Sequence, residues 1–137
     1  MQPTPYVFLN GTAREALTTW GKIFGATPEI MSAADMPPGT MDIPEDRRDW
    51  VMHGSLRIGE GTLMASDNID GTSDAMAGCS VWVAGRTADE ALGMFDALAE
   101  GGEVTMPFAP TFWSAGFGTC VDRFGIRWMV DTEASGD

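Results

Sequence analysis

The sequence predicts an α+β protein made of two tandem βαβββ modules, whose strands form a strongly curved mixed sheet around a cavity. Three observations predict it. Helical patterns at 12–24 and 87–99 both carry the triplet Glu-Ala-Leu near their starts. Each half then closes on a β-rich run that begins with Gly and ends with Asp, at 61–67 and at 125–131. The length of 137 residues accommodates two such units.

The first module opens with a short β-rich run at 5–9, which Asn10-Gly11 ends. Thr12 and Glu15 have the spacing of a capping box, so a helix is expected to begin there and to stop at Gly25. Proline, glycine and methionine predict an irregular loop after the second strand. The remaining strands of this module are expected at 27–32, 49–58 and 62–66.

The second module repeats this order after a polar, Gly-rich linker at 68–78. The modules span about 3–67 and 79–131 within one domain of 1–137, and 133–137 is expected to be a frayed tail. Strands and one irregular bridge are expected around the helix: strands at 79–84, 103–106, 112–121 and 126–131, and the bridge at 107–110.

The charge balance excludes several classes of partner. Eight Lys and Arg against 20 Asp and Glu leave a net charge of -12, which repels nucleic acid and anionic lipid. No stretch approaches the roughly 20 apolar residues of a membrane span, and the N-terminus lacks the layout of a signal peptide. A cytoplasmic protein is therefore expected. Cys79 and Cys120 lack CxxC spacing and are expected to be buried, reduced thiols within strands.

Several segments, taken in order along the chain, resemble one known family. They are TPYVF at 4–8, VMHGSL at 51–56, LMASD at 63–67, FW at 112–113 and DRFGIRWM at 122–129. Together they resemble the PhnB-like branch of the glyoxalase/bleomycin resistance/dioxygenase superfamily, also called the vicinal oxygen chelate superfamily. The resemblance implies the glyoxalase fold and a homodimer. Some members carry a demethylubiquinone methyltransferase label, but no Gly-rich methyl-donor loop is present, so a methyltransferase is not expected.

The resemblance also implies four positions for ligands of a divalent metal. They fall at Thr4 or Pro5, at Met64 or Ala65, at Cys79 and at Met129. None of these residues is a histidine or a carboxylate, and one thiolate does not hold a catalytic metal. No metal or other cofactor is therefore predicted, and a metal site is kept as the alternative.

His53 is the only histidine, so it is the one candidate for an imidazole base. Strand alternation puts it on one face with Val51 and Ser55. Asp67 and Asp131 are expected at equivalent places after the two closing strands. The candidate catalytic residues are therefore His53 and Asp67. Both aspartates also fit strand ends that face water or cap a turn, which is the favoured interpretation, and His53 also fits a packed or surface position.

Four tryptophans fall on expected strands, which is more than a small core needs. The candidate ligand-binding residues are Trp50, Trp82, Trp113 and Trp128. Their rings suit an apolar slot for a planar ligand, and they equally suit a core or a dimer seam.

Three functions follow. The first is metal-independent binding of a small apolar or aromatic molecule. The second is a divalent-metal lyase, isomerase or dioxygenase, and the third is a metal-free acid/base enzyme that uses His53.

Overall fold

The computed structural model describes residues 1–134, which form two compact units. One unit spans Met1–Asp74 and the other begins at Ala75. The junction lies inside the stretch 68–78 that the sequence marks as the linker. Of the tail expected at 133–137, residues 135–137 lie outside the described residues.

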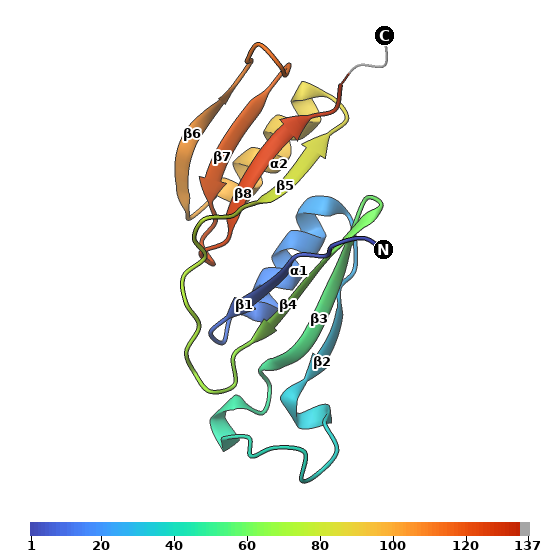
Figure 1. Ribbon diagram of the computed structural model, residues 1–137, viewed down its shortest axis with the longest axis vertical. Helices are drawn as coiled ribbons and strands as arrows, with labels where there is room; N and C mark the ends of the chain where they lie inside the picture. Colours follow the sequence, from blue (N-terminus) through green and yellow to red (C-terminus); the bar gives the residue numbers. More distant parts are fainter. Residues whose placement is uncertain (135–137) are drawn as a thin grey trace. The chain divides into compact units, whose positions relative to one another are not determined.

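The first unit is a four-stranded sheet with one helix (Figure 1). Its strands stand in the order β1-β4-β3-β2, with β1 parallel to β4 and the other neighbours antiparallel. Two short 3₁₀ turns, Ala33–Asp35 and Glu45–Arg47, lie in the long loop before β3. The elements are β1 Tyr6–Leu9, α1 Ala13–Phe24, β2 Glu29–Ser32, β3 Val51–Ile58 and β4 Gly61–Asp67.

The second unit repeats this topology, with strand order β5-β8-β7-β6 and a parallel β5–β8 pair. Its elements are β5 Val81–Gly85, α2 Ala88–Ala99, β6 Glu103–Ala109, β7 Phe117–Val121 and β8 Arg127–Thr132. The predicted α+β class and the duplicated βαβββ module are confirmed, and the strands are divided between two four-stranded mixed sheets. The expected cavity stays a prediction.

Two predicted elements of the second unit are wrong. β6 continues through the expected bridge to Ala109, because two shifts of register around Met106 let the strand accommodate Pro107 at the sheet edge. β7 begins only at Phe117, because the backbone turns at Ser114, whose carbonyl accepts from the Thr111 N–H at 2.9 Å. Cys79 is also exposed and precedes β5, whereas Cys120 is buried in β7; both are free thiols.

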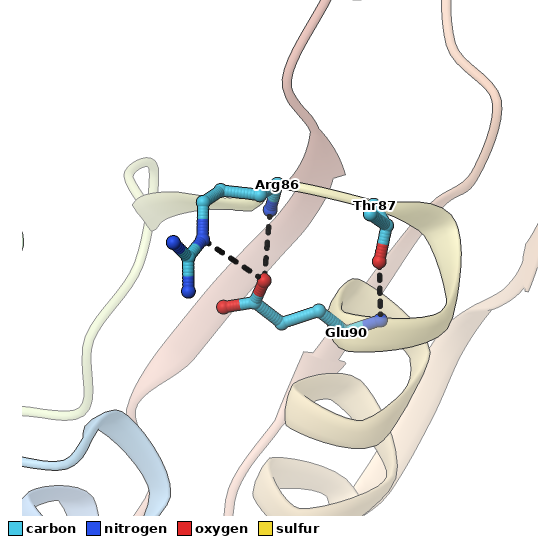
Figure 2. Close-up of polar contacts among 3 residues, drawn as sticks. All are labelled: Arg86, Thr87 and Glu90. Atoms are coloured by element: carbon cyan, nitrogen blue, oxygen red, sulfur yellow. Dashed lines mark hydrogen bonds and ion pairs between the residues drawn. The ribbon is translucent and has the colours of Figure 1, made fainter.

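The two helices begin with different capping interactions. At α2, Thr87 Oγ1 accepts from the Glu90 N–H at 3.1 Å, and Glu90 Oε2 accepts from the Arg86 N–H and Nε (Figure 2). At α1, the Thr12 side chain makes no capping hydrogen bond. The predicted capping box there is therefore wrong, and a carboxylate from β4, described below, takes the place of the Thr12 side chain. Gly25 ends α1 in the left-handed conformation, as predicted.

Each helix packs on one face of its own sheet, and each unit has its own core (Figure 1). In the first unit Leu17 and Trp20 of α1 are fully buried, and Leu17 lies close to Gly54 of β3. In the second unit Phe95 of α2 packs near Gly118 of β7. Burial of these side chains stabilises each unit by roughly 1.5–3 kcal/mol per large apolar residue. Within residues 1–134, no α-helix of the same unit covers the opposite face of either sheet (Figure 1).

Candidate functional site

The helix-free face of the first sheet carries exposed aromatic side chains. Tyr6 and Phe8 alternate along β1 with the buried Val7 and Leu9, so their side chains leave the sheet on the side opposite α1. Tyr6 is 38% exposed and Phe8 is 59% exposed, and their ring centroids lie 5.2 Å apart. This pair forms an aromatic surface at the edge of the sheet.

His53 lies on the same face as these rings. Along β3 it alternates with Gly54, whose α-carbon faces Leu17 of the helix. The Tyr6 hydroxyl lies 3.2 Å from Nδ1 of His53, and the two ring centroids are 5.7 Å apart. Met31 of β2 is the register partner of His53 and is also exposed. We call Tyr6, Phe8, Met31 and His53 the first-sheet platform.

Asp67 lies on the opposite, helix-facing side of this sheet. Its side chain is buried and accepts three backbone hydrogen bonds. Oδ1 accepts from the N–H groups of Gly11 and Ala13 at 2.8 and 3.0 Å, and Oδ2 accepts from the Val51 N–H at 2.9 Å. The carboxylate thus joins β4 to the start of α1 and to β3. The structure does not bring His53 and Asp67 together, since they leave opposite faces of the sheet.

Asp131 is not the counterpart of Asp67. In β8 it alternates with Trp128 and Val130, which are fully buried, so Asp131 faces away from α2. There Oδ1 accepts from Ser114 Oγ at 2.6 Å. The expected equivalence of the two aspartates is therefore wrong, because an offset of one residue between two strands exchanges the faces.

Two of the four candidate tryptophans are held by neighbouring protein groups. Trp128 has no exposed surface, and its Nε1 donates to Asp122 Oδ2 at 2.8 Å in the core of the second unit. Trp50 precedes β3, is half-buried, and packs beside Gly11, with the Arg47 guanidinium 4.6 Å from its ring centroid. Both rings therefore pack within the protein and contribute to its structure.

The other two tryptophans are exposed. Trp82 lies on the helix-free face of β5 and is 56% exposed. Trp113 is 54% exposed and lies in the loop before β7, not on the predicted strand. It makes edge-on contacts with Phe112 and Phe117, at centroid distances of 4.8 and 5.4 Å. We call Phe112, Trp113 and Phe117 the second-unit aromatic cluster.

Sequence reasoning did not single out Tyr6 or Phe8 as site residues. The run from Tyr6 to Leu9 is apolar at every position, so the sequence carries no period-2 signal for which side chains face the helix. Ser114 was missed as well, although Gly116 two residues later is a turn signal.

Comparison with known proteins identifies the family. A model of the glyoxalase/bleomycin resistance protein/dioxygenase superfamily matches residues 5–130. The chain belongs to this superfamily. Within the superfamily it is similar to the protein YjdN from Escherichia coli strain K12, with 27% identity over 96% of this chain and 95% of the relative.

Solved structures of relatives have the same fold. Protein PA1353 from Pseudomonas aeruginosa is 42% identical to this chain, with a TM-score of 0.83 over 98% of this chain and 99% of that one. The PhnB protein from Bacillus cereus is 20% identical, with a TM-score of 0.79 over 97% and 100% of the two chains, and this likeness shows the fold alone. The resemblance to the glyoxalase/bleomycin resistance/dioxygenase superfamily is thereby confirmed.

The residues at the positions implied for the superfamily's divalent metal do not fit such a metal. Met64 lies in β4 and donates its N–H to the Pro5 carbonyl at 3.0 Å, Met129 lies in β8, and Cys79 is exposed. Thioethers and a proline are poor partners for a hard or borderline cation. Within residues 1–134, no three His, Cys, Asp or Glu side chains gather in a way that could hold a metal ion.

One further finding concerns membranes. None of the helices in the described part of the chain has the length and apolar character needed to cross a bilayer.

Proposed function

We propose that this protein binds a small apolar or aromatic molecule without the divalent metal of its superfamily. The observation that carries the proposal is the exposure of large aromatic side chains on sheet faces opposite the helices, at Tyr6, Phe8 and Trp82, together with Trp113. Such rings offer a large, rigid apolar contact area at a low cost in side-chain entropy, which suits a planar ligand.

The second unit supports the proposal in detail. Trp113 is held edge-on against Phe117, which is buried, so the exposed part of the indole has a fixed support. Beside it, the Ser114 hydroxyl and the Asp131 carboxylate form a hydrogen-bonded pair. A ligand site typically combines a mostly apolar surface with a few fixed polar groups, and this face has both.

The residues at the four implied ligand positions support binding without a metal. Catalytic metal sites use histidine and carboxylate ligands, and the four implied positions carry neither. Binding energy in this protein would therefore come from apolar contact and hydrogen bonds. The superfamily's metal-dependent lyase, isomerase or dioxygenase chemistry is the competing function.

A fluorescence titration with N-phenyl-1-naphthylamine, a neutral apolar probe, tests the proposal. We expect Trp82→Ala and Trp113→Ala each to weaken probe binding by about 5- to 20-fold, because each removes roughly 1–2 kcal/mol of aromatic contact. Leu92→Ala is the matched control, since Leu92 is 40% exposed on α2, and its affinity should match that of the wild type. Unchanged binding in both tryptophan variants would contradict the proposal.

We further propose a cytoplasmic homodimer, as the superfamily resemblance implies. A single sheet face covers a ligand from one side only, whereas ligand sites commonly bury 70–90% or more of a ligand's surface. Light scattering on the untagged protein measures its oligomeric state directly. A monomer at micromolar concentration would contradict the proposed homodimer.

A further inference from the structure

We propose that the first-sheet platform recognises an aryl hydroxyl group, with Tyr6 and His53 as its paired hydrogen-bonding residues. The inference rests on the proposed function, because Tyr6 and Phe8 belong to both, and it names the chemical class of ligand from residues of the first unit alone. It does not depend on Trp82 or Trp113, so its failure and that of the preceding proposal can be told apart.

The two side chains meet across an intervening strand. Tyr6 lies on β1 and His53 on β3, with β4 between them, and Met64 of β4 is the register partner of Tyr6. The 3.2 Å contact joins residues 47 positions apart in the sequence. Because two different strands supply the pair, its geometry depends on the folded sheet rather than on local sequence.

The hydrogen bond between the two residues leaves a definite pattern of free groups. If the Tyr6 O–H donates to Nδ1, the neutral imidazole carries its proton on Nε2, and the tyrosine oxygen keeps a lone pair to accept with. If Nδ1–H donates instead, the Tyr6 O–H is free to donate and Nε2 is free to accept. In both cases the pair offers one donor and one acceptor. A hydroxyl group, which donates and accepts at one atom, complements both arrangements.

The surroundings favour a planar, uncharged group that carries this hydroxyl. Phe8 is 59% exposed beside the Tyr6 ring, and Met31 is exposed opposite His53, so both flank the pair with apolar surface. The charged groups that face the same side are Glu29 of β2 and Arg57 of β3, both exposed. Glu29 and Arg57 carry opposite charges, so the chain charge of -12 is what disfavours an anionic ligand. A neutral phenol or naphthol fits these conditions.

The test compares two probes that differ only in the hydrogen-bonding group, 2-naphthol and 2-methoxynaphthalene. Because His53 is the only histidine, its imidazole proton resonances in the untagged protein report binding without ambiguity. We expect the wild type to bind 2-naphthol about 10-fold more tightly, as one or two net hydrogen bonds allow, with a shift of the His53 signals.

Variants of the pair should remove this preference. In Tyr6→Phe and His53→Leu the affinity ratio of the two probes should fall to within about twofold of 1. Ser55→Ala, a neighbouring polar residue on the same face of β3, is the matched control and should keep the ratio. A preference that persists in both variants overturns the inference. So does a wild type that binds neither probe, or that binds both equally.

Discussion

Oδ1 of Asp67, at the end of β4, accepts a hydrogen bond from the backbone N–H of Ala13 at 3.0 Å, within the first turn of α1. The last strand of the first unit thus caps the unit's only α-helix, and the same oxygen accepts from Gly11. A carboxylate here also complements the positive end of the helix dipole. This contact explains why Thr12 does not need to cap the helix itself.

Replacing Asp67 should therefore destabilise the fold. Asp67→Ala leaves three buried or partly buried backbone N–H groups without their acceptor, and we expect the free energy of unfolding to fall by about 2–4 kcal/mol. Urea denaturation followed by circular dichroism measures it. Asp131→Ala is the control, because that carboxylate is only half-buried and lies on the helix-free face of the second sheet. Its replacement should lower the free energy of unfolding by about 1 kcal/mol. An equal fall in the free energy of unfolding in the two variants would contradict the capping role of Asp67.

Gly85 and Gly93 should respond in opposite directions to alanine. A β-carbon at Gly85 would lie 2.6 Å from the Ala91 backbone nitrogen, so Gly85→Ala must push α2 away from β5 and should cost about 1–3 kcal/mol. At Gly93, within α2, nothing lies within 4 Å of such an atom, and Gly93→Ala should stabilise the protein by about 0.5–1 kcal/mol. Thermal unfolding distinguishes the two signs.

The two cysteines should differ in reactivity. Cys79 is exposed, whereas Cys120 is buried, and burial raises the pKa of the Cys120 thiol. A disulfide reagent such as dithionitrobenzoate should modify one thiol per folded chain within minutes and both thiols in urea. Cys79→Ser should abolish the fast reaction. Fast reaction of that variant would show that Cys120 is accessible in the native protein.

Burial of Cys120 also predicts a loss of stability at high pH. Desolvation, and secondly the Asp122 carboxylate, raise the pKa of this thiol from 9.0 to about 11. Between these values the unfolded thiol ionises while the folded one stays protonated, so the unfolded state binds fewer protons and stability falls as pH rises. The stability difference between wild type and Cys120→Ala should shrink by about 2 kcal/mol from about pH 8 to about pH 10.5. A difference independent of pH would contradict it.

Metal analysis separates the proposed function from its main competitor. Because the four implied ligand positions lack histidine and carboxylate, we expect untagged protein purified without chelator to hold far less than one equivalent of transition metal per chain by elemental mass spectrometry. Treatment with a chelator should then leave the unfolding temperature unchanged. One retained equivalent, with destabilisation on its removal, would favour the metal-dependent enzyme.

Local signals explain why the repeat could be predicted from sequence. The helix period, the Gly25 terminator and the Thr87–Glu90 spacing act within a few residues, so each is visible in a single sequence. The start of β7 was not visible. Residues 112–117 are rich in aromatics typical of strands, but hydrogen bonds of Ser114 to Gly116 and Asp131 hold the backbone in a turn.

The candidate site was harder to predict because it depends on contacts between distant residues. The sequence places His53 on one face of its strand with Val51 and Ser55, but alternation does not tell which of the two faces packs against the helix. The Tyr6 contact depends on the register of three strands. A shift of that register by one residue would move the Asp67 side chain to the other face of the sheet.

The parallel pairing of β1 with β4 has a consequence for synthesis of the chain. Each sheet takes all four of its strands from its own half of the sequence. The first sheet therefore has its last strand outside the ribosome as soon as Asp67 has emerged, before β5 to β8 emerge. At about 5–20 residues per second, the N-terminal half has seconds to fold before all strands of the C-terminal half have emerged, so similar strands of the two halves have little opportunity to mispair.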